Sequence, residues 1–216
     1  MCNPMNAYQE TVKRFLLLDH SDVVLRSGVS CANGFYTIDY FNSKYKVGES
    51  GKVFLADSPG EEVPFNDRTI ILQYLCEASG LPPRNRWLSF LELPEGEHHY
   101  VPFQIDATNP LARIFGDKPD AFRRAAAALG GRQIDLGDIS FSIPALPKLP
   151  LAVALWEGDE DFPSRSIILF DAVAPFHLTT AALWVLGVEL AHKMLYHYDR
   201  DVGTKAAITW LEGKRK

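Results

Sequence analysis

The chain has 216 residues, of which 47% are hydrophobic, 12% aromatic and 23% charged. This composition excludes a disordered, collagen-like or coiled-coil protein, and the length suits one large domain or two small ones. Because 22 basic residues stand against 27 acidic residues, the net charge of −5 argues against a nucleic-acid-binding protein, which usually carries a basic excess.

The expected compartment follows from the termini, the apolar segments and the cysteines. The first ten residues are polar and lack the apolar region of a secretory signal. No segment approaches the roughly 18 apolar residues that cross a bilayer, so we expect no membrane partner. The three cysteines Cys2, Cys31 and Cys76 form no disulfide framework, and reduced thiols in the cytoplasm are the simplest interpretation.

The first third of the chain predicts two helices followed by a β-meander. The apolar spacing indicates an amphipathic helix over residues 6–19, and Ser21 or Asp22 is expected to cap a short helix that ends at Gly28. Aromatic and β-branched residues predict strands over residues 35–41, 45–47 and 52–56. Residues 48–52 superficially resemble a phosphate loop, but they lack its spacing and its final hydroxyl, so a hairpin turn is favoured.

In the rest of the chain the predicted helices and strands are segregated in blocks and do not alternate strictly. Asp67 is expected to cap a helix over residues 68–79, with Gly80 just past its end. Residues 87–93 predict a strand or the start of a loop. Further helices are predicted over residues 108–115 and 117–129, and strands over 139–143, 151–156 and 167–170. The longest helix should begin after Thr179 or Thr180 and reach about Tyr198, and a short helix should follow over 205–211.

Segregated blocks favour an α+β fold over a doubly wound parallel sheet. We therefore expect a single domain over residues 1–216, with antiparallel or mixed sheets, packed helices and a long C-terminal helix. No linker is rich enough in glycine, serine or proline to mark a domain boundary.

An acidic loop over residues 157–161 is the first candidate for chemistry. Four carboxylates in five residues repel one another, and clustered oxygens on a loop can hold calcium or magnesium. With Asp171, the carboxylates Glu157, Asp159 and Asp161 would supply oxygen ligands for a metal-dependent enzyme. The spacing is not that of an EF-hand, and a solvated hairpin loop that keeps a sheet edge soluble is the favoured interpretation.

The second candidate is Glu189 with His192 on the long helix, where the i, i+3 spacing places both side chains on one face. Di-iron bundles need two such motifs and further glutamates, and only one motif is present. Because Glu189 is equally well placed for an i, i+4 ion pair with Lys193, a surface position is favoured.

The third candidate is aromatic. Many aromatic residues lie on or beside predicted strands, and a cleft with aromatic walls and a few carboxylates is the usual form of a small-molecule site. Burial of the same rings in the core is the alternative. The residues concerned are Trp87, Phe90, Tyr100, Phe103, Trp156, Phe162 and Phe176.

Three segments resemble the DUF3786 family, a domain of unknown function from anaerobic bacteria and archaea. They are residues 67–75, residues 86–96, and residues 155–163 with 168–171. The likeness extends over about residues 8–195, leaving 199–216 as a C-terminal extension. The resemblance implies an α+β domain of anaerobes and no established activity. The matching residues are Trp87, Ser89, Phe90, Glu92, Leu93, Pro94, Trp156, Glu157, Gly158, Asp159, Phe162, Pro163, Phe170 and Asp171.

These patterns lead to a cytoplasmic binding or accessory protein with a small-molecule or protein partner, in a cofactor- or metal-related role in anaerobic metabolism. The cofactor itself is not specified by the sequence. A metal-dependent enzyme at the acidic loop is the alternative, and a redox role for Cys31 or Cys76 is a third. The expected ligand-binding residues are Trp87, Glu92, Tyr100, Trp156, Glu157, Asp159, Phe162 and Asp171. All of this requires residues 87–94 and 156–171 to meet around one pocket.

Overall fold

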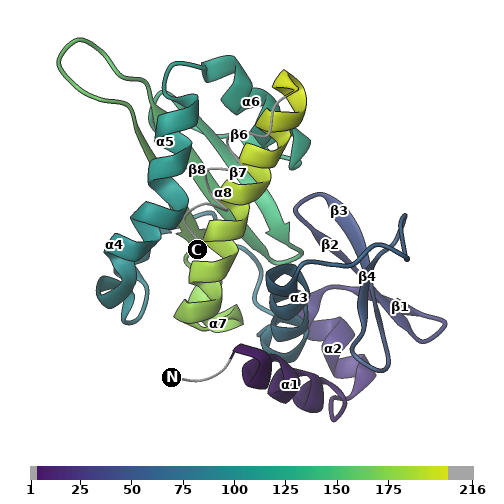
Figure 1. Ribbon diagram of the computed structural model, residues 1–216. Helices are drawn as coiled ribbons and strands as arrows, with labels where there is room; N and C mark the ends of the chain where they lie inside the picture. Colours follow the sequence, from purple (N-terminus) through teal and green to yellow (C-terminus); the bar gives the residue numbers. More distant parts are fainter. Residues whose placement is uncertain (1–3, 204–216) are drawn as a thin grey trace.

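A computed structural model describes residues 4–203 of the chain (Figure 1). The helix predicted over residues 205–211 lies outside this range. Helices α1 (Pro4–Phe15) and α2 (His20–Ser27) precede a four-stranded antiparallel meander of β1 (Ser30–Ala32), β2 (Phe35–Tyr40), β3 (Ser43–Gly48) and β4 (Val53–Leu55). Along β2 the side chains of Tyr36, Ile38 and Tyr40 are buried in alternation, because successive residues of a strand face opposite sides of a sheet.

The second sheet has five antiparallel strands in the order β5-β9-β8-β7-β6. They are β5 (Trp87–Ser89), β6 (Arg132–Gln133), β7 (Ile139–Leu146), β8 (Leu149–Trp156) and β9 (Arg165–Asp171). The central strand β8 is buried along almost its whole length, which explains its continuous apolar sequence. The loop between β8 and β9 projects away from the sheet (Figure 1).

Helices pack across one face of this sheet, and α8 (Thr180–Val202) is the longest of them (Figure 1). The others are α4 (Tyr100–Phe103), the π-helix η3 (Gln104–Thr108), α5 (Asn109–Phe115), α6 (Pro119–Ala128) and the short α7 (Ala174–His177). The 3-10 helices η1 (Phe90–Glu92) and η2 (Gly96–His99) follow β5. Within residues 4–203, no helix combines the length and apolar character that a membrane span requires.

The two sheets are joined through helix α3 (Phe65–Glu77) and through the turn after β2. The N–H of Phe41 donates to the carbonyl of Ala145 on β7 over 3.1 Å, and the Asn42 amide donates to the carbonyl of Ala128 at the end of α6 over 3.1 Å. Since α3 also packs on α8, the β2–β3 hairpin is fixed beside the C-terminal helix.

The predicted α+β class, antiparallel pairing and long C-terminal helix are confirmed. The local signals were correct at Gly28, which ends α2 with a φ of 75°, and at Thr179, whose side chain accepts the N–H of Ala182. Other caps differ from expectation. Asp19, not Ser21 or Asp22, caps α2 by accepting the N–H of Asp22.

The prediction that Asp67 caps α3 is wrong. The helix begins after Pro64, because proline supplies a suitable backbone angle where no N–H bond is needed, and Asp67 lies inside the first turn with a buried side chain. The helix ends at Glu77, two residues before the position expected from Gly80. The side chain of Asp67 is therefore available for contacts with the rest of the fold.

Candidate ligand-binding site

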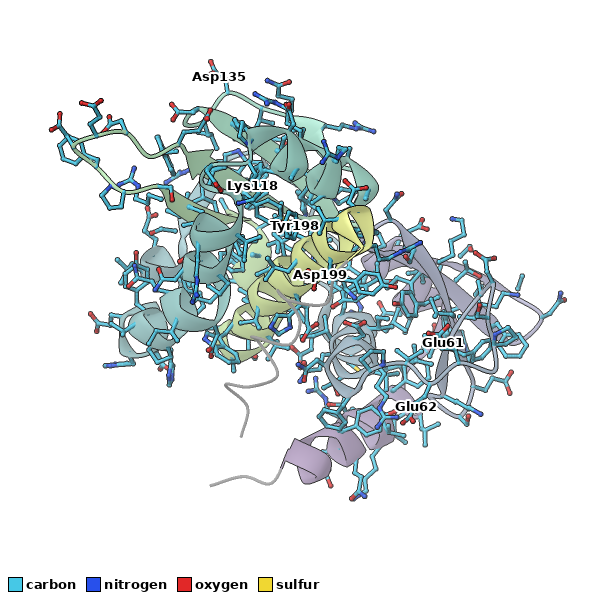
Figure 2. The ribbon with its side chains drawn as sticks, turned by 45° about the horizontal axis from the view of Figure 1, so that its top comes forward. Glu61, Glu62, Lys118, Asp135, Tyr198 and Asp199 are labelled. Atoms are coloured by element: carbon cyan, nitrogen blue, oxygen red, sulfur yellow. The ribbon has the colours of Figure 1, made fainter. Side chains whose placement is uncertain are left out.

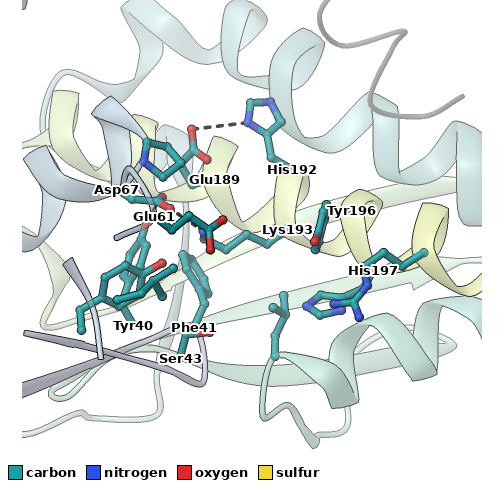
Figure 3. Close-up of a pocket in the computed structure, with 15 residues that line it drawn as sticks. Tyr40, Phe41, Ser43, Glu61, Asp67, Glu189, His192, Lys193, Tyr196 and His197 are labelled. Carbon is teal, nitrogen blue, oxygen red and sulfur yellow. Dashed lines mark hydrogen bonds and ion pairs between the residues drawn. The ribbon is translucent and has the colours of Figure 1, made fainter. Parts of the chain in front are cut away.

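A cavity lies between the β2–β3 hairpin and α8, and we call it the α8 pocket (Figure 3). Its volume is about 550 Å³. One wall is largely aromatic and the other is largely charged. The walls are built by Tyr40, Phe41, Ser43, Tyr45, Leu55, Glu61, Pro64, Asp67, Leu129, Glu189, His192, Lys193, Tyr196, His197 and Arg200.

An ion pair between a buried carboxylate and a half-buried ammonium lies on the wall of the α8 pocket. Lys193 Nζ donates to Asp67 Oδ2 over 2.8 Å, and the Tyr40 hydroxyl donates to Asp67 Oδ1 over 3.0 Å. The Asp67 side chain is 3% exposed and that of Lys193 is 22% exposed. The same ammonium lies 5.0 Å from the centre of the Tyr40 ring and 5.7 Å from that of Phe41, within reach of cation–π attraction.

The surroundings of Asp67 act on its charge in opposite directions. Burial raises the pKa of Asp67 and the charge of Glu189 raises it further, while the charge and hydrogen bond of Lys193 and the bond from Tyr40 lower it. The net effect is a pKa above the ordinary value. Burial, followed by the charge of Asp67, raises the pKa of Tyr40 well above its usual value, so the phenol stays protonated and remains a donor.

A second carboxylate, Glu189, lies beside this pair with its own partners. The Asn66 amide donates to Glu189 Oε1 over 2.7 Å, and His192 Nδ1 lies 3.4 Å from the same oxygen (Figure 3). Burial acts to raise the pKa of Glu189, but the bond and charge of His192, the bond from Asn66 and the charge of Lys193 outweigh it. The pKa of Glu189 is therefore lowered, and this carboxylate stays ionised more readily than Asp67.

The favoured surface position for Glu189 and His192 is therefore wrong. Glu189 is buried at 8% exposure, and Lys193 pairs with Asp67 of α3 instead of with Glu189. The spacing did place these side chains on one face of the helix. That face turns inward because α3 packs against α8 and the rings of Tyr40 and Phe41 lie beside Lys193.

The outer part of the α8 pocket carries further charged and aromatic groups. Tyr196, His197 and Arg200 continue the face of α8 that bears Glu189 and Lys193, because residues spaced by three, four and seven share one side of a helix. Glu61 reaches the pocket from the opposite side, where it follows the four-stranded sheet (Figures 2 and 3). Burial, then the charges of Arg200 and Lys193, lowers the pKa of His197.

Part of this site was predicted from the sequence. The spacing placed Glu189 and His192 on one face of the long helix, with Lys193 as an alternative ion-pair partner of Glu189. Their partners Asp67 and Tyr40 lie 126 and 153 positions before Lys193, and no local pattern connects them.

The two segments predicted to meet, residues 87–94 and 156–171, do line a second cavity of about 230 Å³, which we call the β9 pocket. Ser89 and Phe90 come from the first segment, and Trp156 and residues 164–168 come from the second. Of the predicted ligand-binding residues, Tyr100 and Trp156 line it.

The remaining predicted residues are dispersed. Trp87 lies on β5 opposite Asp171 of β9. Glu92 accepts from the N–H and hydroxyl of Ser89 over 2.7 and 2.8 Å, which closes the cap of η1. Phe162 is exposed at 70% on the β8–β9 loop. None of these three lines the β9 pocket.

The predicted convergence of the acidic loop with Asp171 is wrong. Glu157 and Asp159 are exposed on the loop that joins the end of β8 to the start of β9, whereas Asp171 ends β9, about 20 Å away at roughly 3.3 Å per residue. Asp171 is fully buried and accepts the backbone N–H groups of Arg84, Asn85 and Val173. It fixes the segment that enters β5, which is a structural role.

Asp159 likewise serves its own loop, because Oδ1 accepts the N–H groups of Asp161 and Phe162. Across residues 4–203, no group of three or more histidine, cysteine, aspartate or glutamate side chains is arranged to hold a metal ion. Cys76 is buried in the core, and burial raises the pKa of its thiol to about 11, which disfavours the thiolate form that a redox role would use.

Fold and site together define a single α+β domain with a charged pocket beside its long C-terminal helix. The model of DUF3786, a domain of unknown function, matches residues 19–193. Since this match spans more than half of the sequence, the chain belongs to the DUF3786 family. Comparisons with curated proteins and with solved structures found no match.

Proposed function

We propose that this DUF3786 domain is a binding protein for a small organic molecule, a metabolite or a cofactor, and that the α8 pocket is its site. The observation that carries the proposal is the Asp67–Lys193 pair on the wall of a cavity of about 550 Å³. Ligand pockets commonly measure roughly 300–1,000 Å³ and combine apolar walls with a few placed polar groups.

The pair supports a binding role because buried charges are costly. Taking two charges out of water often costs as much as their attraction returns, so a buried ion pair is weak evidence for a role in stability. Ionisable groups with shifted pKa values in a cleft are candidates for function. The competing interpretation is a structural link between α3 and α8, and the experiment below separates the two.

Lys193 is the group best placed to meet a ligand. Its ammonium has three donors, and the hydrogen bond to Asp67 uses one of them. The rings of Tyr40 and Phe41 hold the ammonium in place. A ligand acceptor such as a carbonyl, carboxylate or phosphate oxygen fits the remaining donors, while the aromatic wall accommodates an apolar part.

A cytoplasmic setting remains part of the proposal. Cys31 and Cys76 are free thiols in the structure, which suits a reducing compartment. The net charge of −5 supports a partner other than nucleic acid. The anaerobic setting rests on the family resemblance, and the test is therefore made on protein purified without oxygen.

Native mass spectrometry of the protein purified anaerobically from its own host tests the proposal. We expect an added small mass on the wild type and its loss in Lys193→Met, because the variant removes the donors but keeps the apolar chain. Lys13→Met is the matched control, since Lys13 is exposed on α1 and forms a surface ion pair with Glu10.

If Lys193→Met does not fold, Arg200→Gln at the exposed mouth replaces it. No added mass on the wild type, or an equal mass on wild type and pocket variants, would contradict the proposal and leave the Asp67–Lys193 pair as a structural link.

A further inference from the structure

The β9 pocket is a second, independent concavity whose lining has a distinct chemistry. Of the described residues that line it, only Arg165 carries a formal charge at neutral pH. Its floor is apolar, with Phe90, Phe103 and Ile168 all buried at 1% exposure or less. The volume of about 230 Å³ corresponds to roughly eight water molecules at ~30 Å³ each. Such a space suits a small organic molecule rather than a single ion.

Arg165 is held in position without a carboxylate partner. Its guanidinium carbon lies 4.3 Å from the centre of the Trp156 ring. No ion pair or hydrogen bond of the guanidinium occurs within residues 4–203. Stacking uses the face of the guanidinium and leaves its N–H edge free, and that edge matches the two oxygens of a carboxylate.

Neutral hydrogen-bonding groups at the same pocket also lack partners within the described part of the chain. They are the amides of Gln104 and Asn109 and the hydroxyl of Tyr100. By contrast, the Ser164 and Ser166 hydroxyls donate to the carbonyls of Ala112 and Thr108 over 3.1 and 2.6 Å. The groups left for a ligand are therefore one cation and three neutral donors.

The backbone at this pocket is irregular. Between α4 and α5 the helix widens to the π-helix η3, in which the N–H of Asn109 donates to the carbonyl of Gln104, five residues earlier. The lining residues Gln104 and Thr108 belong to this segment. Such π-helical turns are rare and frequently lie at functional sites, because they redirect side chains at some cost in helix stability.

From these observations we propose that the β9 pocket binds a small organic carboxylate. The carboxylate pairs with the N–H edge of Arg165, the amides of Gln104 and Asn109 bind its other polar groups, and its carbon skeleton lies on Phe90 and Phe103. This site is separate from the α8 pocket and does not depend on the function proposed there.

Calorimetric titration of the full chain tests this with benzoate, acetate and succinate, and with the neutral amides benzamide and acetamide. We expect at least one carboxylate to bind and its matching amide to bind at least tenfold more weakly. Arg165→Gln should weaken the binding of that carboxylate by at least tenfold. Arg132→Gln on β6 is the matched control, since Arg132 is an exposed arginine of the same sheet outside the pocket.

Two further variants locate the binding site and keep the test decisive if Arg165→Gln does not fold. Gln104→Leu, which leaves the charge intact, should also weaken binding, whereas Gln133→Leu should leave it unchanged because Gln133 is exposed on β6 outside the pocket. The proposal is overturned if no carboxylate binds the wild type, if amides bind equally well, or if Arg165→Gln and Gln104→Leu both bind as the wild type does.

Discussion

His177 is a buried residue whose hydrogen bonds define its protonation state. It is 1% exposed, and its Nδ1 accepts the backbone N–H of Ser79 over 3.1 Å. Nδ1 must then be unprotonated, so the ring proton lies on Nε2 and is donated to the carbonyl of Leu81 over 3.1 Å. Burial, helped by the charge of Lys148, lowers the pKa of His177 although the Leu81 bond and Asp171 act in the opposite direction. The folded protein therefore keeps this ring neutral.

This arrangement predicts a loss of stability in weak acid. The pKa of His177 is lower when folded than its ordinary value of about 6.5, so the unfolded chain binds more protons below that pH. The free energy of unfolding should fall as the pH falls through about 6.5. Urea unfolding at pH 7.5 and pH 5.5 measures the difference in the free energy of unfolding between the two pH values. This pH difference should be smaller in His177→Asn than in the wild type.

His99→Asn is the control, because His99 is exposed and should leave the pH difference as in the wild type. The difference should shrink without vanishing, since His197 also has a lowered pKa and contributes with the same sign. An unchanged pH difference in His177→Asn would refute the assignment.

Asp67 shows why part of the site escaped sequence reasoning. An aspartate near the start of a helix usually caps it, and that local rule was applied here. The structure instead uses the carboxylate to bind Tyr40 and Lys193, which come from a strand and a helix far apart in the chain. Local patterns describe a residue's own element, whereas a buried charge is explained by the partner that tertiary packing supplies.

At the scale of elements, Gly187 allows α8 to approach its neighbours closely. A Cβ atom added there would lie 2.7 Å from Cε2 of Phe103 and 3.2 Å from Cζ of Phe170. Phe103 cannot easily move, because it stacks on Phe90 with ring centres 4.4 Å apart. The glycine thus sets the distance between α8 and the aromatic cluster beneath the β9 pocket.

Gly187→Ala should therefore destabilise the fold. Alanine in place of glycine stabilises a helix by roughly 0.5–1 kcal/mol, whereas overpacking a core costs about 1–3 kcal/mol, so the clash should dominate. Chemical denaturation measures the change in the free energy of unfolding. Gly60→Ala is the control, since nothing lies within 4 Å of a Cβ atom there. A Gly187→Ala variant more stable than the wild type would contradict this prediction and would show that the rings of Phe103 and Phe170 can move to make room.

The secondary-structure elements were predicted more accurately than the tertiary contacts between them. Gly28, Thr179 and the aromatic and β-branched residues of β2 carry signals that act within one turn or one strand, and each was correct. The π-helix η3 was not predicted, because a widened turn has no sequence signature comparable to a cap. The β9 pocket was predicted only as a meeting of segments, and its arginine was overlooked in favour of nearby carboxylates.

At the scale of the molecule, the turn between β7 and β8 ties the five-stranded sheet to the helices α2 and α3. Lys148 Nζ donates to the carbonyls of Leu25 and Gly80 over 2.9 and 3.2 Å. The N–H of Lys148 donates to the Tyr74 hydroxyl, which in turn donates to the carbonyl of Ser27, each over 3.0 Å. These four bonds should couple the two halves during unfolding.

We therefore expect a single cooperative transition. Trp87, Trp156 and Trp184 lie on the side of the five-stranded sheet, and Trp210 lies outside the described residues. In a Trp210→Phe background, tryptophan fluorescence therefore reports that half, whereas far-ultraviolet circular dichroism reports both. The midpoints in urea should coincide, and Lys148→Met should lower both together, with Lys13→Met as the exposed control. Separate midpoints in the wild type would show two independently folding parts.

The outermost strands of both sheets are short: β1, β4 and β5 have three residues each and β6 has two. A long, flat edge strand would offer a row of unpaired amide and carbonyl groups to a neighbouring molecule. Here each border offers only a few such groups, so fibril-like growth by strand addition finds little template. Stretches capable of it, such as the apolar β8, lie in the middle of their sheet and become available only after unfolding.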